Sequence, residues 1–309
     1  MTPKETVLMA LKQGALAGSW ILIGAKGVGK KEFAKRLGAF LITGDWGADI
    51  GYSPDIKWVQ RGMTDEAKRA IQKALTSGKE VTEEDLEKSA VKKEITVNEI
   101  REATQFMALK SDKGGWRLVV ISLADEMNEF AQNALLKALE EPNEKMVVLL
   151  LCQNPGTLLP TILSRCRQMI LKPLSLPEAV SFFKDKYNLD EEKAGLLAML
   201  SEGAVGQAEE IMTLGGLELY RDLTSFFVPF PELNQVKLLS FLDKVVKNEG
   251  TYRLIRGFIY KWLAEQSKTQ EQCLALYEEA GHLFGAEQAI NLDKKHVLLV
   301  LITKIGQAL

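Results

Sequence analysis

Hydrophobic positions along the chain follow two different patterns, which meet near residue 173. Before that residue, short and continuous apolar runs alternate with segments of helical periodicity. Such runs are typical of parallel strands buried on both faces of a sheet, and their alternation with helices is typical of α/β folds. We therefore predict a parallel-sheet domain over residues 1–172. Its expected strands cover residues 20–23, 53–59, 116–123, 146–152 and 168–171.

Beyond residue 173 every segment has helical periodicity, so the second part of the chain is predicted to be all-α. Three short helical segments, separated by Asn188 and Gly203, predict a small three-helix domain over residues 173–214. Five longer segments predict a helical domain over residues 215–309. In the last of them apolar residues surround the helix, which indicates that it lies buried within a bundle.

Two of the predicted helices carry apolar stripes that should face the core. The segment after the third strand predicts a helix from about residue 125 to residue 141, which Pro142 ends. The second long helix of the C-terminal part also has apolar residues at helical spacing. The predicted stripes are Met127, Phe130, Ala134, Leu135, Ala138 and Leu139 in the first helix, and Val236, Leu239, Leu242 and Val246 in the second.

Composition and charge exclude several classes of protein. The formal net charge of -2 provides no overall positive field for nucleic acid, and no apolar run approaches the length of a membrane span. The charged stretch 61–93 predicts exposed helices or a surface excursion. Cys152, Cys166 and Cys273 are too few and too scattered for a disulfide framework or a zinc site. We expect a reduced, cytoplasmic protein without a leader peptide and without zinc.

A glycine-rich loop, Gly24-Ala25-Lys26-Gly27-Val28-Gly29-Lys30-Lys31, follows the first predicted strand and precedes a helix. Glycines so placed let backbone N–H groups curl around a phosphate, and Lys30 can reach the terminal phosphates. A P-loop has Ser or Thr after its lysine, because that hydroxyl ligates Mg²⁺, but Lys31 stands there. The loop is therefore either a degenerate nucleotide site or only a tight strand-to-helix turn. Its expected phosphate-binding residues are Gly24, Gly27, Gly29 and Lys30.

A second metal position is also changed. P-loop ATPases place an aspartate at the end of a later strand, where it holds the Mg²⁺ shell, and Ser122 occupies that position. Asp125 and Glu126 follow, and we interpret them as charges that complement the N-terminal end of a helix dipole. The alternative is that they replace the lost ligands in an ATPase with unconventional metal ligands. The joint loss at Lys31 and Ser122 predicts a site that does not hydrolyse nucleotide.

Two motifs resemble the bacterial clamp-loader family of AAA+ proteins. They are NALLKALEEP over residues 133–142 and LPTILSRC over residues 159–166. In that family the triplet Ser164-Arg165-Cys166 marks an arginine finger. Together with the lost metal positions, the triplet is similar to the non-catalytic, delta-prime type of subunit, and the segment 291–295 resembles the C-terminal part of the same type.

The resemblance implies a degenerate AAA+ domain, a three-helix lid and a helical collar that holds a ring of subunits. It implies gamma or tau ATPase subunits and a delta subunit as partners, with the sliding clamp and primed DNA contacted through the complex. Arg165 would act in trans on the γ-phosphate of a neighbouring subunit. Gln207 stands where motor subunits carry a nucleotide-sensing arginine. No metal or cofactor is expected, and residual phosphate binding at the loop stays open.

Two other interpretations of Arg165 remain open at this point. An arginine at this spacing can be a surface residue held in an ion pair. It can also contact a DNA phosphate, in which case the α/β domain would be a DNA-binding scaffold.

Overall fold

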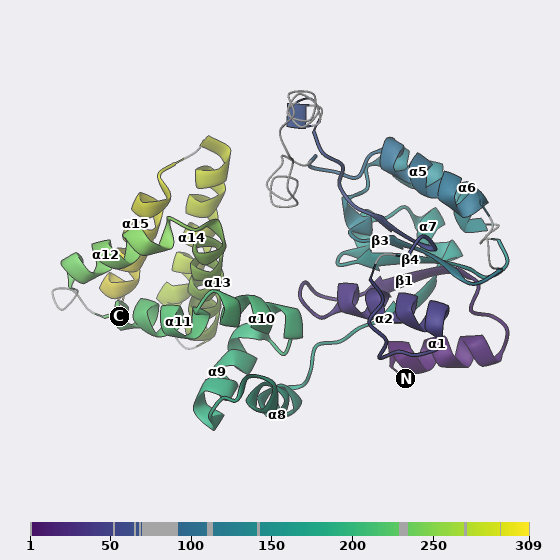
Figure 1. The fold of residues 1–309 in the computed structure, drawn as a ribbon. Helices are drawn as coiled ribbons and strands as arrows, with labels where there is room; N and C mark the ends of the chain where they lie inside the picture. Colours follow the sequence, from purple (N-terminus) through teal and green to yellow (C-terminus); the bar gives the residue numbers. More distant parts are fainter. Residues whose placement is uncertain are drawn as a thin grey trace, which may run out of the picture. The chain divides into compact units, whose positions relative to one another are not determined.

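The computed structural model describes residues 2–51, 53–64, 66–67, 69, 92–109, 114–140, 143–228, 234–268, 271–290 and 292–308. Much of the charged stretch 61–93 lies outside these ranges, so its predicted exposure stays a prediction. The chain divides into two compact units, Met1–Pro173 and Leu174–Leu309, and each is described by itself (Figure 1). No helix in the described ranges is both long and apolar enough to cross a membrane.

A parallel five-stranded sheet lies at the centre of the first unit, with the strand order β2-β3-β4-β1-β5. Its strands are β1 (Gly18–Ile23), β2 (Ile56–Val59), β3 (Arg117–Ile121), β4 (Met146–Cys152) and β5 (Arg167–Ile170). Every residue of β3 and β4 is buried, as their continuous apolar runs predict. β1 lies between β4 and β5, and Ile23 pairs with both Cys152 and Ile170. The chain therefore leaves β1 where the ends of three strands meet.

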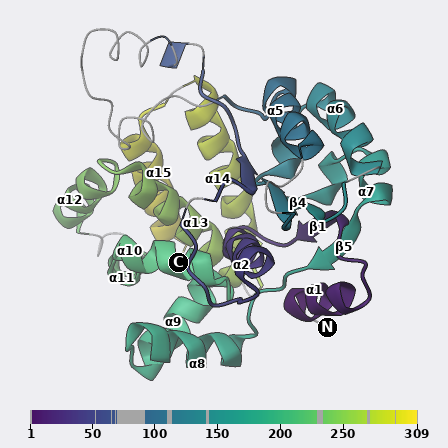
Figure 2. The ribbon, with the colours of Figure 1, turned by 45° about the vertical axis from the view of Figure 1, so that its right-hand side comes forward.

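Helices cover both faces of this sheet, so the first unit has three layers. The α-helices described in this unit are α1 (Pro3–Lys12), α2 (Lys30–Thr43), α5 (Val97–Ala108), α6 (Glu129–Glu140) and α7 (Pro160–Arg165). Buried residues of α5, α6 and α7 share one hydrophobic cluster, and those of α1 and α2 share another. In Figures 1 and 2, α5 and α6 lie above the sheet and α1 lies below it. This arrangement confirms the predicted α/β class of the N-terminal domain.

The helix after β3 differs from its prediction in start and in orientation. A 3₁₀ turn covers Ala124–Glu126, and α6 begins only at Glu129. Its buried residues are Ala131, Gln132, Leu135 and Leu139, whereas Phe130, predicted to be buried, is 77% exposed. The predicted stripe was therefore wrong at Phe130.

A polar side chain explains why α6 turns this face inward. Gln132 is 5% exposed, and its amide nitrogen donates to the carbonyls of Met127 and Thr157 at 3.0 and 3.3 Å. Its amide oxygen accepts from the N–H of Leu159 at 2.8 Å. Three backbone partners offset most of the free-energy cost of burying the Gln132 amide. This polar residue can therefore occupy a core position, although a prediction from hydrophobic periodicity assigns such positions to apolar residues.

The second unit is helical throughout its described residues. Its helices are α8 (Leu176–Tyr187), α9 (Glu191–Ser201), α10 (Val205–Thr213), α11 (Gly216–Ser225), α12 (Gln235–Val245), α13 (Glu249–Gln266), α14 (Glu271–Ile290) and α15 (Lys294–Ala308). One hydrophobic cluster runs from Ala179 in α8 to Ile305 in α15. The all-α prediction is confirmed, whereas the division of this part at residue 214 stays a prediction.

The stripe predicted for α12 is wrong at two positions. Val236 and Leu239 are 79% and 38% exposed, whereas Phe241 and Val245 are buried. The sequence of α12 contains two overlapping apolar stripes, and the one with the larger side chain, Phe241, removes more apolar surface from water. In α15 the prediction of burial on all sides is also too strong, because one face is buried and the other is partly exposed.

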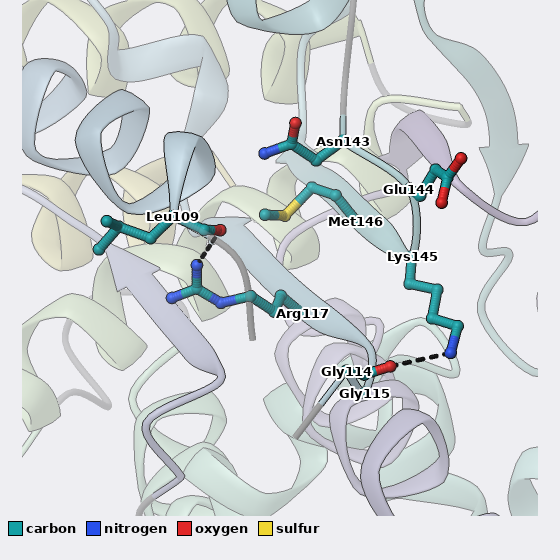
Figure 3. Close-up of a pocket in the computed structure, with 8 residues that line it drawn as sticks. All are labelled: Leu109, Gly114, Gly115, Arg117, Asn143, Glu144, Lys145 and Met146. Carbon is teal, nitrogen blue, oxygen red and sulfur yellow. Dashed lines mark hydrogen bonds between the residues drawn. The ribbon is translucent and has the colours of Figure 1, made fainter. Parts of the chain in front are cut away.

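A buried arginine ties the end of α5 to the sheet. Arg117 begins β3, is 7% exposed, and donates through Nη1 to the carbonyls of Phe106 and Leu109. Its guanidinium lies 3.7 Å from the centre of the Phe106 ring, and its Nε lies 3.5 Å from a carboxylate oxygen of Asp55. Figure 3 shows the bond to Leu109 in the wall of a cavity of about 450 Å³. Arg117 thus gives the carbonyl of Leu109, just beyond α5, a donor, and it gives a second donor to the carbonyl of Phe106, which also accepts from the N–H of Leu109 at 3.2 Å.

The first unit contains two buried cysteines. Cys152 ends β4 and Cys166 follows α7, and both are buried. Burial raises the pKa of each thiol to about 12. At Cys152 the Asp125 carboxylate adds to the effect of burial and the Lys30 ammonium opposes it, and the pKa of about 12 includes both.

Replacing Arg117 by leucine is expected to lower the free energy of unfolding by about 2 to 4 kcal/mol, because two carbonyls and the Asp55 carboxylate lose a partner. Urea unfolding measures this loss. Arg101→Leu, on an exposed position of α5, should change the same quantity by less than about 0.5 kcal/mol. Equal losses in the two variants would contradict the tie between α5 and the sheet.

The thiols of Cys152 and Cys166 are expected to react slowly with a disulfide reagent in the native chain. With a pKa of about 12, about one thiol in ten thousand is ionised at pH 8. In denaturant both should react quickly, and the rate should rise with pH toward the ordinary thiol pKa. Fast native labelling of either cysteine, located by mass spectrometry, would contradict the burial.

Candidate functional site

The glycine loop joins β1 to α2 at the edge where the strands end. The N–H of Gly24 donates to the carbonyl of Cys152 at 3.1 Å. A Cβ at Gly24 would lie 2.5 Å from the carbonyl oxygen of Leu171, so only glycine passes between the ends of β4 and β5 without a backbone shift. Gly27 and Gly29 have φ of 76° and 104°, in the left-handed region. The predicted loop residues are therefore brought together in one turn between β1 and α2, which fits both the phosphate-binding and the purely structural interpretation.

The loop binds its own lysine. Lys30 is 8% exposed, and its Nζ donates to the carbonyls of Gly24 at 2.6 Å and Ala25 at 2.9 Å. Burial lowers the pKa of the Lys30 ammonium, while the nearby Asp125 carboxylate and Cys152 thiol act to raise it. The amino group that would meet a phosphate in an active P-loop is bonded here to loop carbonyls.

The residues at the two metal positions do not fit Mg²⁺. Lys31 is exposed at the second position of α2 and offers a cation where a metal needs an oxygen ligand. Ser122, just beyond β3, donates its backbone N–H to the carbonyl of Val59 at 2.9 Å and has no carboxylate to offer. In the described ranges no group of three or more His, Cys, Asp or Glu side chains is placed to hold a metal ion.

Asp125 and Glu126 do not lie at the start of α6 as predicted. Both belong to the 3₁₀ turn before that helix, because α6 begins three residues later. An oxygen of Asp125 accepts from the N–H of Gln153 at 3.2 Å, whereas Glu126 lies 3.0 Å from the Nε of Arg61. The two carboxylates thus have separate partners, and only Asp125 acts on Lys30.

Arg165 ends α7 and is exposed. Its Nε donates to Oε1 of Glu140 at 2.7 Å, its Nη2 lies 2.7 Å from the same oxygen, and its Nη1 donates to the carbonyl of Thr161 at 3.0 Å. The side chain retains 36% of its accessible surface, so a partner molecule can reach it. Glu140 was not singled out as a functional residue, although it lies within the first family motif.

The neighbours of Arg165 fix its backbone. The N–H of Cys166 donates to the carbonyl of Ile162 at 3.1 Å, and both side chains belong to the hydrophobic cluster under α5, α6 and α7. Ser164 is exposed, and its hydroxyl donates to the carbonyl of Thr161 at 3.1 Å. Arg165 is therefore held at the surface, because the buried side chains of Ile162 and Cys166 fix the backbone on either side of it.

Two further features lie apart from this arrangement. Gln207 is half-buried near the start of α10, in the second unit.

The cavity of Figure 3 lies at the beginnings of β3 and β4, beside Arg117 and Met146. Because the strands are parallel, that edge is opposite to the one carrying the glycine loop. The cavity therefore lies at the end of the sheet opposite to the glycine loop.

Comparisons with known proteins agree with the family resemblance. The family model described as "DNA polymerase III, delta subunit" matches residues 4–175. A DNA polymerase III subunit delta' of Pseudomonas aeruginosa is 34% identical over 152 residues, which are 49% of this chain and 42% of the relative. The corresponding subunit of Haemophilus influenzae is 29% identical over 153 residues, which are 49% of this chain and 47% of the relative. The chain thus spans less than half the length of these curated relatives.

A solved structure agrees in fold over nearly the whole chain. A DNA polymerase III gamma subunit-related protein from Thermotoga maritima aligns with a TM-score of 0.57 and 15% identity, covering 98% of this chain and 99% of that one. This likeness supports the order of a parallel-sheet domain followed by helical domains. The family model spans more than half of the 309 residues of this chain, so the chain belongs to the DNA polymerase III delta-subunit family, and the two relatives described above are delta-prime subunits.

Proposed function

We propose that this chain is the non-catalytic, delta-prime subunit of a DNA polymerase III clamp loader and supports the loading of the sliding clamp onto primed DNA. The observation that carries the proposal is the placement of Arg165. It is exposed on a fixed backbone, in a unit whose own metal positions hold Lys31 and Ser122. A domain that is not expected to hold Mg²⁺ but presents a cation is suited to complete a site on another subunit.

In this mechanism Arg165 acts as an arginine finger in trans. The guanidinium is planar, is always charged and has five N–H donors, so it matches the γ-phosphate of a nucleotide bound by a neighbouring ATPase subunit. As charge develops on the transferred phosphoryl group, the finger stabilises it, which is worth about 10³- to 10⁵-fold in rate. The chain itself contributes no water-orienting acid and no metal ligand to that step.

The partners would be gamma or tau ATPase subunits and a delta subunit in a hetero-oligomeric ring in the cytoplasm. The helical residues 215–309 would form the collar that joins the ring, and residues 173–214 would form the lid. The similarity to named subunits of DNA polymerase III supports this assignment. Clamp and primed DNA would be contacted through the assembled complex.

The second candidate is an ATPase that uses Asp125 as a substitute metal ligand. It is favoured by one observation, the influence of the Asp125 carboxylate on the Lys30 ammonium. Against it stand the bond that the Asp125 carboxylate accepts from the N–H of Gln153 and the bonds that Lys30 donates to the loop carbonyls. A DNA-binding scaffold is less favoured, because the net charge of -2 gives weak attraction to DNA phosphates.

The purified chain alone is expected to hydrolyse no ATP, because both Mg²⁺ positions lack oxygen ligands suited to the metal. Phosphate release in Mg²⁺ buffer measures this, with Lys30→Ala as the control for contaminating activity. Steady turnover that Lys30→Ala abolishes would replace the proposal with the second candidate.

In the reconstituted complex with the ATPase subunits of its own organism, Arg165→Ala is expected to slow clamp loading by at least about tenfold. Total ATPase should fall by less, since sites that do not use this chain's finger remain intact. Fluorescent-clamp loading and phosphate release measure the two rates.

The matched control is Arg36→Ala, which removes an exposed arginine whose Nε lies 2.8 Å from Glu32 on the other face of the sheet. It should leave both rates unchanged. An unchanged loading rate in Arg165→Ala would overturn the proposed role of this residue. Loss of DNA affinity with normal ATPase would favour the scaffold instead.

A further inference from the structure

The Arg165 guanidinium contacts the Glu140 carboxylate and the Thr161 carbonyl. Nε donates to the Glu140 carboxylate at 2.7 Å, Nη2 lies 2.7 Å from the same oxygen, and Nη1 donates to the Thr161 carbonyl at 3.0 Å. These three contacts use one N–H on each guanidinium nitrogen. A guanidinium has five N–H bonds, so a second N–H on each terminal nitrogen is not needed for them.

The backbones that carry this pair are held by the same core. Glu140 is the last residue of α6 and Arg165 is the last residue of α7. Next to them, Leu139 and Cys166 are buried in one hydrophobic cluster. Packing therefore sets the separation of the two Cα atoms. The ion pair restricts what remains free, which is the conformation of the long arginine side chain.

We propose that Glu140 is a positioning residue for Arg165, holding the Nε edge of the guanidinium so that its terminal nitrogens face the nucleotide of the neighbouring subunit. This inference rests on the proposed function. Glu140 touches neither substrate nor reacting atoms and acts only through the arginine. In this arrangement the carboxylate stays on one edge of the guanidinium while the phosphate is bound at the other.

The strength of the pair suits this role. The Glu140 and Arg165 side chains are 48% and 36% exposed, and ion pairs with such exposure shift an equilibrium by about fivefold or less. An arginine finger changes a rate by about 10³- to 10⁵-fold. The carboxylate can therefore bias the side-chain conformation without competing effectively with a phosphate for the guanidinium.

The size of the expected effect follows from rotamer counting. Each sp³–sp³ torsion of an arginine side chain has three staggered wells. If the loss of Glu140 frees one of these torsions, the fraction of molecules with a productive conformation falls about threefold, which is within the fivefold limit of an exposed pair. The corresponding loss is one of turnover rate and not of nucleotide affinity, because the finger acts in the transition state.

The experiment compares Glu140→Ala, Arg165→Ala and the double variant in the reconstituted complex. Glu140→Ala is expected to lower the clamp-dependent kcat about threefold, and by no more than about fivefold, with an unchanged KM for ATP. Glu140→Gln, which keeps an amide oxygen that accepts from Nε, should recover part of the rate. The double variant should equal Arg165→Ala alone, because Glu140 acts only through that arginine.

A matched control removes the same residue type from a similar pair. Glu32→Ala breaks the exposed Arg36–Glu32 pair, which has the same Nε-to-Oε1 geometry at 2.8 Å. It should leave kcat unchanged, and thermal melting of all variants should match that of the unsubstituted chain. A kcat loss in Glu140→Ala that comes from misfolding would be accompanied by a lower melting temperature.

The outcomes separate this inference from the proposed function. If Arg165→Ala slows the complex while Glu140→Ala leaves it unchanged, makes it faster, or adds to Arg165→Ala in the double variant, the positioning role is overturned and the finger stands. If Arg165→Ala itself has no effect, the proposed function fails, and the positioning role fails with it.

Discussion

The complete burial of β3 and β4 between two helix layers is the constraint on which the rest of the first unit depends. Strands without an exposed face have a register that cannot slip without moving apolar side chains, so their ends are fixed. β1 is paired beside β4 in register from Gly18 to Ile23, which fixes the point where the glycine loop begins. The same packing anchors α7 through Ile162 and so determines the position of Arg165.

Two cations of the first unit, one after the end of β1 and one before the start of β5, have opposite surroundings. Lys30 is buried, and its amino group is bonded to carbonyls of its own loop. Arg165 is exposed and is paired with a carboxylate that solvent reaches. In free-energy terms, an external anion would have to break bonds in a desolvated site to reach Lys30, whereas at Arg165 it meets a weak surface pair. This contrast supports the proposed roles of the two residues. Lys30 takes no part in catalysis in its own subunit, whereas Arg165 contributes to the site of a neighbouring subunit.

The sequence predicted those parts of the structure that depend on local patterns. Continuous apolar runs located β3 and β4 within two residues, and the motif around Ser164, Arg165 and Cys166 indicated the family that the comparisons confirm. The orientation of α6 was missed because Gln132, a polar residue, is buried through three backbone hydrogen bonds. Such bonds involve loops that are distant in sequence, and the hydrophobic periodicity of a helix carries no information about them.

The partner of Arg165 could not be predicted for the same reason. Glu140 precedes it by 25 residues, and their contact exists only because α6 and α7 pack side by side on the sheet. In α12, local pattern alone left two stripes available, and the bulk of Phe241 decided between them. Pairing between elements, and the choice between equivalent faces, are thus set by tertiary packing.

The amide of Gln132 has a mechanical consequence. It links the turn before α6, through Met127, to the segment that leads into α7, through Thr157 and Leu159. Sliding one helix along the other would strip a desolvated amide of its partners, which is costly compared with moving both helices together. The three bonds thus favour joint movement of the two helices, which would keep Glu140 and Arg165 at one separation whenever the domain shifts.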